Sequence, residues 1–138
     1  MADETFIDTS GFYSLLVRRD PMHARAAEFI ADAAGVRGRF VTTDYVIDET
    51  VTLLKARGHG ELVGPLFQAI DNSAAMRVEW MTSERFAEAR SFCLRHSDKA
   101  WSFTDCASFV VMQSLGLTRA LTSDNHFEQG GFQVLLKD

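Results

Sequence analysis

The chain has 138 residues, 46% hydrophobic and 24% charged, which is the size and composition of one soluble domain. We therefore treat 1–138 as a single domain; no run approaches the ~18 consecutive apolar residues of a membrane helix, which argues against a membrane protein. The net charge of −5 argues against broad nucleic-acid binding through a basic surface, because phosphate contacts need clustered Lys and Arg.

The start of the chain, Met1-Ala2-Asp3-Glu4, is acidic and runs directly into a strand-like segment. A secretory signal would begin with positive charge and continue into an apolar run. We therefore expect no secretory signal and a cytoplasmic protein. The two cysteines, Cys93 and Cys106, form no CxxC pair and are expected to be buried, reduced thiols.

Short apolar runs alternate with longer helical patterns, which is typical of βαβ units and a parallel sheet. Strands are predicted over 5–7, 39–42, 76–80, 119–122 and 132–136, the last at an edge of the sheet. Helices are predicted over 10–17, 21–35, 44–58, 61–71, 83–96 and 103–115, the second with Asp20 as its cap and Pro21 as its first residue. The last of these is apolar nearly all round, so it is expected to be buried. The predicted fold is an α/β, three-layer α/β/α sandwich with a mostly parallel sheet of about five strands.

Two aspartates follow predicted strands. Asp8 closes the first strand, and Asp124 follows the fourth in Leu121-Thr122-Ser123-Asp124. Ligands of open α/β sheets bind beyond the carboxyl ends of the strands, so both side chains are expected at a binding edge. The alternative is that each aspartate only begins a turn or caps a helix.

Glu49 lies within an apolar stripe of the third predicted helix, three residues after Val46 and four before Leu53. A carboxylate in that position is costly unless it is paired or coordinated. A glutamate at the edge of the core, paired with an arginine, is the alternative. Asp48 points elsewhere and is expected to face solvent.

Asp105 lies in the first turn of the most apolar helix, in Ser102-Phe103-Thr104-Asp105-Cys106. An acid at this place stabilises the helix dipole, and Ser102 with Asp105 resembles a capping box. Its position alone does not decide between a cap and a metal ligand. Carboxylates from separate elements, however, suit Mg²⁺ or Mn²⁺. Metals held in this way serve phosphodiester chemistry.

Four segments together resemble the PIN-domain family, and specifically its VapC-type toxins, over nearly the whole chain. The segments are Phe6-Ile7-Asp8-Thr9-Ser10, Thr43-Asp44-Tyr45-Val46-Ile47-Asp48-Glu49-Thr50, Ser102-Phe103-Thr104-Asp105-Cys106-Ala107-Ser108-Phe109 and Leu121-Thr122-Ser123-Asp124-Asn125-His126-Phe127. The resemblance implies that the first and fourth strands are neighbours. It also implies an acidic catalytic and metal-binding pocket made of Asp8, Glu49, Asp105 and Asp124.

The resemblance further implies that the hydroxyls of Thr9 and Thr104 orient these carboxylates. The expected activity is Mg²⁺- or Mn²⁺-dependent hydrolysis of single-stranded or looped RNA, with an antitoxin protein as the partner that inhibits it. A homodimer is compatible with this reading. The alternative is a non-catalytic PIN-like module for RNA binding or assembly, against which the intact set of four acids counts. An aspartyl-phosphate phosphatase would need Asp-x-Asp after the first strand, and this chain has Ser10 there.

Three further residues have two readings each. His126, two residues after Asp124, is the histidine expected nearest the pocket, and packing of its loop is the alternative to contact with metal or phosphate. Trp80 and Trp101 are expected to be buried, with stacking on an unpaired base as the alternative.

Overall fold

Five parallel strands form the centre of the computed structural model, which describes residues 4–137. They are β1 (Glu4–Ile7), β2 (Arg39–Thr43), β3 (Met76–Glu79), β4 (Arg119–Leu121) and β5 (Gln133–Val134). The strand order is β3-β2-β1-β4-β5, and all four neighbouring pairs are parallel. The expected adjacency of the first and fourth strands is confirmed, since β1 pairs with β4.

Met1, Ala2, Asp3 and Asp138 lie outside the described residues. Most of the acidic start, on which the expectation of no secretory signal rests, is therefore among the residues not described. The single domain over 1–138 stays a prediction. Within 4–137, each helix is too short or too polar to cross a membrane.

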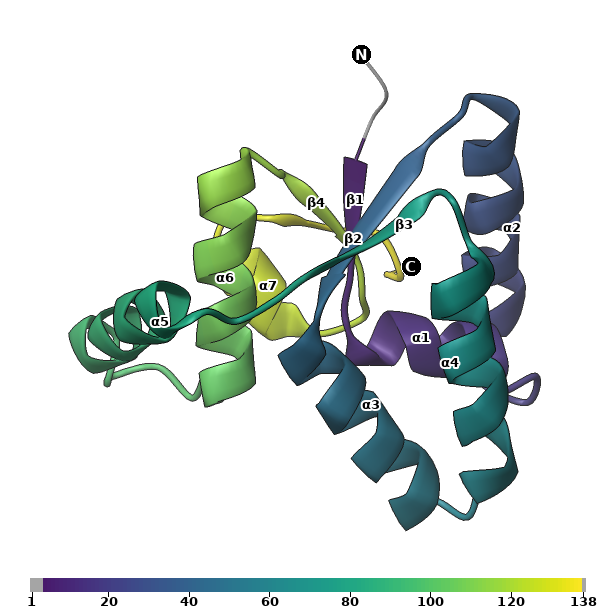
Figure 1. Cartoon of the computed structure of the whole chain (residues 1–138), viewed down its shortest axis with the longest axis horizontal. Coiled ribbons are helices and arrows are strands. Elements are labelled where there is room, and N and C mark those ends of the chain that lie inside the picture. The colour runs from purple at the N-terminus through teal and green to yellow at the C-terminus, as the bar shows by residue number, and fades with distance from the viewer. Residues whose placement is uncertain (1–3, 138) are drawn as a thin grey trace.

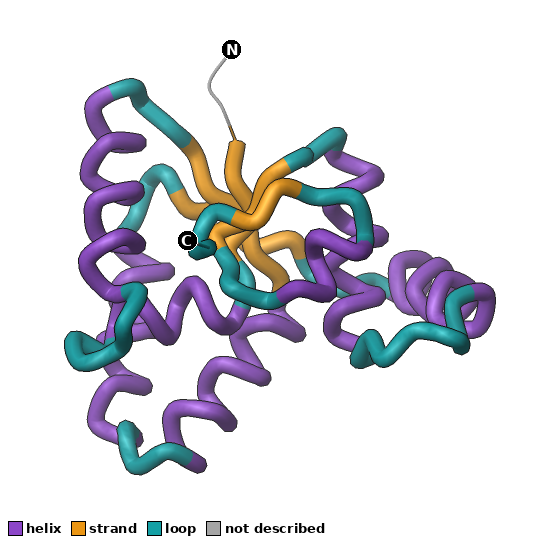
Figure 2. Tube along the Cα trace, turned by 180° about the vertical axis from the view of Figure 1, so that it is seen from behind, coloured by secondary structure: helices purple, strands orange, loops and turns teal. Residues whose placement is uncertain are grey.

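Helices lie on both sides of the sheet, which confirms the three-layer α/β/α class. They are α1 (Thr9–Leu16), α2 (His23–Gly35), α3 (Asp44–Ala56), α4 (Val63–Asn72), α5 (Ser83–Arg95), α6 (Phe103–Leu115) and α7 (Asn125–Gln129), with a 3₁₀ turn at Gly60–Leu62 before α4. Figure 1 shows α1, α2 and α4 on one side and α6 and α7 on the other, with α5 outside α6. The view from behind shows the same arrangement around the strands (Figure 2). α3 leaves β2 at the carboxyl edge of the sheet.

Several predicted boundaries differ from the structure by one or two residues. α2 begins at His23 instead of Pro21, because Asp20 Oδ2 accepts hydrogen bonds from Ser14 Oγ (2.8 Å) and the Met22 N–H (3.0 Å) and so closes a turn before the helix. The fifth strand is shorter than predicted, over 133–134. Cys106 is buried as expected, whereas Cys93 is only half-buried.

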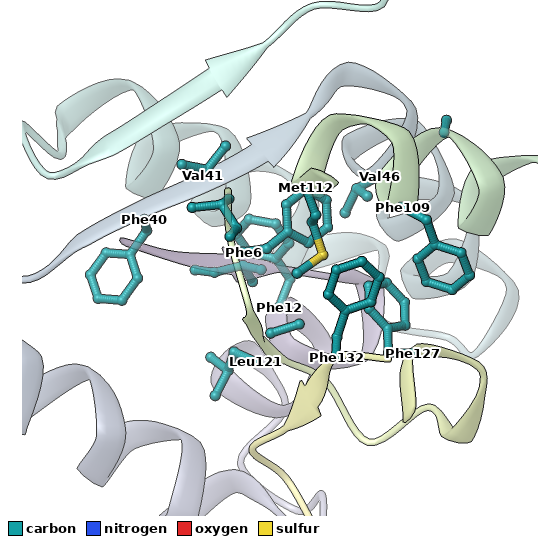
Figure 3. Close-up of a cluster of buried hydrophobic side chains, with 14 of the residues drawn as sticks. Phe6, Phe12, Phe40, Val41, Val46, Phe109, Met112, Leu121, Phe127 and Phe132 are labelled. Atoms are coloured by element: carbon teal, nitrogen blue, oxygen red, sulfur yellow. The ribbon is translucent and has the colours of Figure 1, made fainter. Parts of the chain in front are cut away.

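The core between the sheet and α6 is built from aromatic rings. The Phe109 ring lies 4.9 Å from that of Phe127 and 5.4 Å from that of Phe132 (centroid distances), and Figure 3 shows this group beside Phe6 and Met112. The predicted burial of α6 is confirmed, because every residue from Asp105 to Met112 is buried. Asp105 is thus the first buried residue of this helix.

Gly11 brings α1 against β4 just beside the carboxyl ends of the strands. A Cβ at this position would overlap the Leu121 carbonyl and also approach the Ile7 side chain. The same carbonyl accepts a hydrogen bond from the Asp8 N–H at 3.3 Å. The missing side chain therefore lets the end of β1, the start of α1 and the end of β4 meet.

Candidate metal centre

Asp8 lies at the carboxyl end of β1 and is 4% exposed. It occupies the cap position of α1, yet its side chain makes no capping hydrogen bond. Instead, Oδ2 accepts a hydrogen bond from Thr122 Oγ1 at 3.0 Å. Burial raises the pKa of Asp8 from 3.8 to about 7; the negative charges of Asp105 and Glu49 add to the rise, and hydrogen bonds from Thr9 and Thr122 oppose it. A cation in this pocket would favour the ionised carboxylate.

The Thr122 hydroxyl joins the two predicted strand-end aspartates. Besides donating to Asp8, its oxygen accepts the Asp124 N–H at 3.1 Å and lies 2.9 Å from Ser10 Oγ. When Asp8 is ionised, the single Thr122 proton goes to the carboxylate, so Ser10 must donate to Thr122. Ser10 Oγ in turn accepts the Ser123 N–H at 2.9 Å. This network fixes the end of β4 against the start of α1.

Asp124 begins the short helix α7. Its Oδ1 accepts the His126 N–H at 2.9 Å as a helix cap, and the side chain remains one third exposed. Asp124 is therefore a helix cap, as the alternative prediction for this residue had it. The cap occupies one oxygen, and a carboxylate has further lone pairs for a second role.

Asp105 also acts as a cap. Ser102 Oγ accepts the Asp105 N–H at 3.0 Å, and Asp105 Oδ2 accepts the Ser102 N–H at 3.1 Å, which makes a capping box. The same Oδ2 lies 2.9 Å from His126 Nδ1. Because an ionised carboxylate only accepts, Nδ1 must carry the proton in this contact. Asp105 is 7% exposed, so its charge is directed into this small group of partners.

His126 brings the two caps together, since its Nδ1 also lies 3.6 Å from Asp124 Oδ1. Asp105, Asp124 and His126 each offer a ligand atom within 4.8 Å of the others. Ligands on opposite sides of an octahedral Mg²⁺ are about 4.2 Å apart, at metal–oxygen distances near 2.1 Å. The distances in this group are up to 4.8 Å, so its atoms would have to move slightly closer together around such a cation. With Asp8 nearby, the set is rich in oxygen, the ligand atom that hard divalent cations prefer.

Glu49 extends the negative charge from α3. It is half-buried, and among the ion pairs of residues 4–137 none joins it to an arginine, so the predicted alternative finds no support. Its charge contributes to the raised pKa of Asp8, which places it within electrostatic reach of that carboxylate. Asp48 is exposed, as expected.

The two threonines expected to orient carboxylates lie differently. The Thr9 hydroxyl lies 3.5 Å from the Val46 carbonyl and 3.4 Å from Thr50 Oγ1, so it holds α1 against α3. Thr104 is half-buried, and its carbonyl accepts from Ser108 Oγ at 2.9 Å. In the described chain, the hydroxyl that contacts a carboxylate of the centre is that of Thr122.

Sequence reasoning missed Thr122 and Ser10 and gave His126 only a minor part. Thr122 stands in the segment Leu121-Thr122-Ser123-Asp124, so its place directly after a buried strand was the available signal. The expected burial of Trp80 is wrong, because this residue is 63% exposed. Trp101 is half-buried and stacks on Phe92 at a centroid distance of 5.9 Å.

The chain is similar to known proteins in sequence and in fold. The PIN domain family model matches residues 5–133. The 23S rRNA-specific endonuclease VapC20 of Mycobacterium tuberculosis is 34% identical over 128 residues, which cover 92% of this chain and 94% of that protein. A VapC ribonuclease of Archaeoglobus fulgidus is 29% identical over 124 residues, 88% of this chain and 77% of that protein.

Two crystal structures are similar in fold. That of Mycobacterium tuberculosis VapC20, described as a sarcin-ricin loop cleaving toxin, has a TM-score of 0.82 at 29% identity and covers 93% of this chain and 95% of that chain. The structure of FitAcB from Neisseria gonorrhoeae has a TM-score of 0.63 at 14% identity, with 95% and 96% covered, and supports the fold alone.

Proposed function

Since this chain belongs to the PIN domain family, we propose that it is a metal-dependent endoribonuclease and the toxin of a toxin–antitoxin pair. The observation that supports this most directly is the buried Asp8 carboxylate, whose pKa of about 7 reflects burial and the charges of Asp105 and Glu49. Such a pocket repels an RNA phosphate until a cation is bound. The names of the two relatives, an endonuclease and a ribonuclease, support the same activity.

The proposed metal ligands are Asp8, Glu49, Asp105 and Asp124, which would hold Mg²⁺ or Mn²⁺. When bound, the metal would neutralise phosphate charge and activate water for direct attack on the phosphodiester. Either Glu49 or Asp105 would help to polarise that water. Thr122 would keep Asp8 oriented through the hydrogen bond between them. We propose no covalent enzyme intermediate.

The first substrate to test is the large-subunit ribosomal RNA, because the relative at 34% identity is named for 23S rRNA. We expect the protein to act in the cytoplasm, where ribosomes are assembled. A looped or single-stranded segment is the expected target.

Incubation of the purified protein with total RNA tests the proposal. With Mn²⁺ we expect discrete cleavage products, and with excess EDTA none, because the acidic pocket then lacks the cation that accepts phosphate. Equal cleavage under both conditions would show that the metal mechanism is wrong. RNA binding with no cleavage under either condition would favour the non-catalytic module.

Expression in a bacterial host tests the toxin role. We expect the parent to slow growth, the Asp124→Asn form to be harmless, and co-expression of the protein encoded by an adjoining short gene to relieve the effect. Equal toxicity of the parent and Asp124→Asn would separate the growth effect from nuclease action. Sedimentation of the purified protein tests the homodimer.

A further inference from the structure

Three aromatic rings from different helices form a continuous row, which we call the aromatic stripe. It consists of Tyr45 on α3, Phe103 on α6 and Phe86 on α5. The Tyr45 and Phe103 centroids are 6.2 Å apart, and the Phe103 and Phe86 centroids 5.3 Å. Both distances lie in the range of favourable aromatic contact. The stripe thus links three elements that are distant in sequence.

The inner end of the stripe adjoins the acidic centre. Tyr45 precedes Glu49 by four residues, so the two side chains share one face of α3. Phe103 is the first residue of α6 and lies in the same turn as Asp105, although side chains two residues apart point to different sides of a helix. Both rings are half-buried, so part of each remains accessible. Through Tyr45, a ligand on the stripe would therefore reach the side of the acidic centre formed by Glu49.

The outer end of the stripe is exposed and carries positive charge. Phe86 is 42% exposed, and the Arg90 guanidinium lies 6.0 Å from its ring centroid. At about 100° per residue, Phe86 and Arg90 lie on one side of α5, and Glu84 and Glu88 on the opposite side. The face of α5 next to the stripe is thus cationic, although the chain as a whole has a net charge of −5.

A second exposed ring lies on the neighbouring segment. Trp80 is 63% exposed. The next residue, Met81, donates its N–H to Asp44 Oδ1 at 2.9 Å. Asp44 directly precedes Tyr45, so this bond holds the segment of Trp80 near the stripe. The other cation of this region, Arg85, is neutralised by Glu79 at 2.8 Å. Arg90 is therefore the cation of α5 best placed to meet a phosphate at the stripe.

We propose that the aromatic stripe binds an unpaired RNA base next to the cleaved phosphodiester, with Phe86 stacking on the base and Arg90 contacting a neighbouring phosphate. This rests on the proposed ribonuclease function and adds a site for the substrate beside its metal centre. Exposed aromatic rings bind single-stranded nucleic acid by stacking, which tolerates different bases. The proximity to Glu49 and the arginine favour RNA as the occupant over an apolar protein surface.

Binding of a short, fluorescein-labelled single-stranded RNA of random sequence tests the stripe. Fluorescence anisotropy would be measured with Mn²⁺ in an Asp8→Asn background, so that the probe is not cleaved. We expect Phe86→Ala to raise Kd by about 5- to 150-fold, the equivalent of losing one stacked base. Phe86→Trp should restore binding. Phe67→Ala on α4 is the matched control, because Phe67 is 45% exposed and outside the stripe, and it should bind like the parent.

Two further measurements separate the roles. The slope of log Kobs against log salt is negative, and Arg90→Gln should reduce its magnitude by about 0.7, the value for one phosphate contact on a single strand. A probe with abasic positions should bind the parent more weakly but bind Phe86→Ala with unchanged affinity, because the stacking partner is already missing there.

The possible results fall into distinct classes. Equal affinity with and without Phe86→Ala in the Asp8→Asn background, when the unaltered protein cleaves RNA, would overturn the stripe alone. A parent that neither binds nor cleaves RNA would overturn the proposed function. A dimeric parent that becomes monomeric on Phe86→Ala in sedimentation would assign the stripe to contact between copies and overturn RNA stacking.

Discussion

The carboxylates of the centre are held in two different ways on its two sides. Asp8, at the end of β1, is buried without a capping bond, and burial raises its pKa to about 7. Asp105 and Asp124 lie at the starts of α6 and α7, where backbone N–H groups already bind their oxygens. The helix-end acids therefore stabilise the fold without metal, whereas Asp8 opposes it. Asp8 is thus the carboxylate of the proposed site whose charge has no structural role in the folded chain.

The largest expected effect of this difference is on catalysis. We predict that Asp8→Asn reduces RNA cleavage by at least about 100-fold, because changes that only reorient metal ligands already cost 10–100-fold. The side chain keeps nearly the same shape, so the fold should survive. Cleavage rates with Mn²⁺ and the circular dichroism spectrum of the variant would measure both. Unchanged cleavage would remove Asp8 from the site.

The pH dependence of stability is the second test. The metal-free folded protein holds a proton on Asp8 up to about pH 7, whereas the unfolded chain releases it near 3.8. The free energy of unfolding should therefore fall as pH rises from about 4 to about 7, and it should level off above that. The total fall is on the order of 4 kcal/mol at most. Asp8→Asn should remove this fall and be the more stable protein at pH 8. Urea unfolding in EDTA between about pH 4 and 8 would measure this difference. If the free energy of unfolding changed with pH in the same way for the parent and Asp8→Asn, the raised pKa of Asp8 would be contradicted.

Thr122→Val should have an intermediate effect. Valine keeps the shape but removes the donor to Asp8 and the acceptor of the Asp124 N–H. We expect a 10- to 100-fold loss in Mn²⁺ affinity or cleavage rate. Thr118→Val is the matched control, since Thr118 is exposed just before β4, away from its carboxyl end, and should behave like the parent. Equal behaviour of both variants would mean that the hydroxyl network does not orient Asp8.

The smallest expected effect is on stability, and it distinguishes Asp8 from the acids at the helix ends. Asp105→Asn should destabilise the metal-free protein by roughly 0.3–1 kcal/mol, because a first-turn charge is lost from α6. Asp8→Asn should change stability in the opposite direction at pH 8. Both variants should show a smaller rise in Tm on adding Mn²⁺, because each removes a proposed ligand. A destabilised Asp105→Asn with an undiminished Mn²⁺ shift would leave Asp105 as a cap only.

The sequence predicted those parts of the fold whose causes are local. α6 begins and ends where expected, because Ser102 caps it and Gly116 follows it with a left-handed backbone (φ 69°). The start of α2 was misplaced, because the Asp20 carboxylate bonds Ser14 six residues earlier and so favours a turn. Trp80 was misplaced because β3 ends at Glu79, so Trp80 lies just beyond the strand, where the alternating pattern no longer predicts burial.

In the candidate site, too, the sequence predicted the features with local causes and missed those that depend on tertiary contacts. The strand-end rule placed Asp8 and Asp124 at one edge, because parallel strands end together. The bond between Thr122 and Asp8 joins residues separated by 114 positions. The place of Thr122 after a strand could single it out, but no local pattern predicts which residue it bonds. The contact of His126 with Asp105 similarly depends on how α7 turns after β4. Hydrogen-bond partners of a site are set by tertiary packing, which composition and spacing do not reveal.

The close approach at Gly11 has a genetic consequence. Any side chain there would meet the Leu121 carbonyl and push α1 away from β4, and Asp8 and Thr122 lie on either side of that contact. In a random-mutagenesis selection for cells that survive overexpression, we expect changes at Gly11 among the survivors alongside changes at the acids. Such survivors would carry every proposed ligand intact. The substitutions that inactivate this chain should therefore include changes at Gly11, a residue that has no side chain and takes no part in the chemistry.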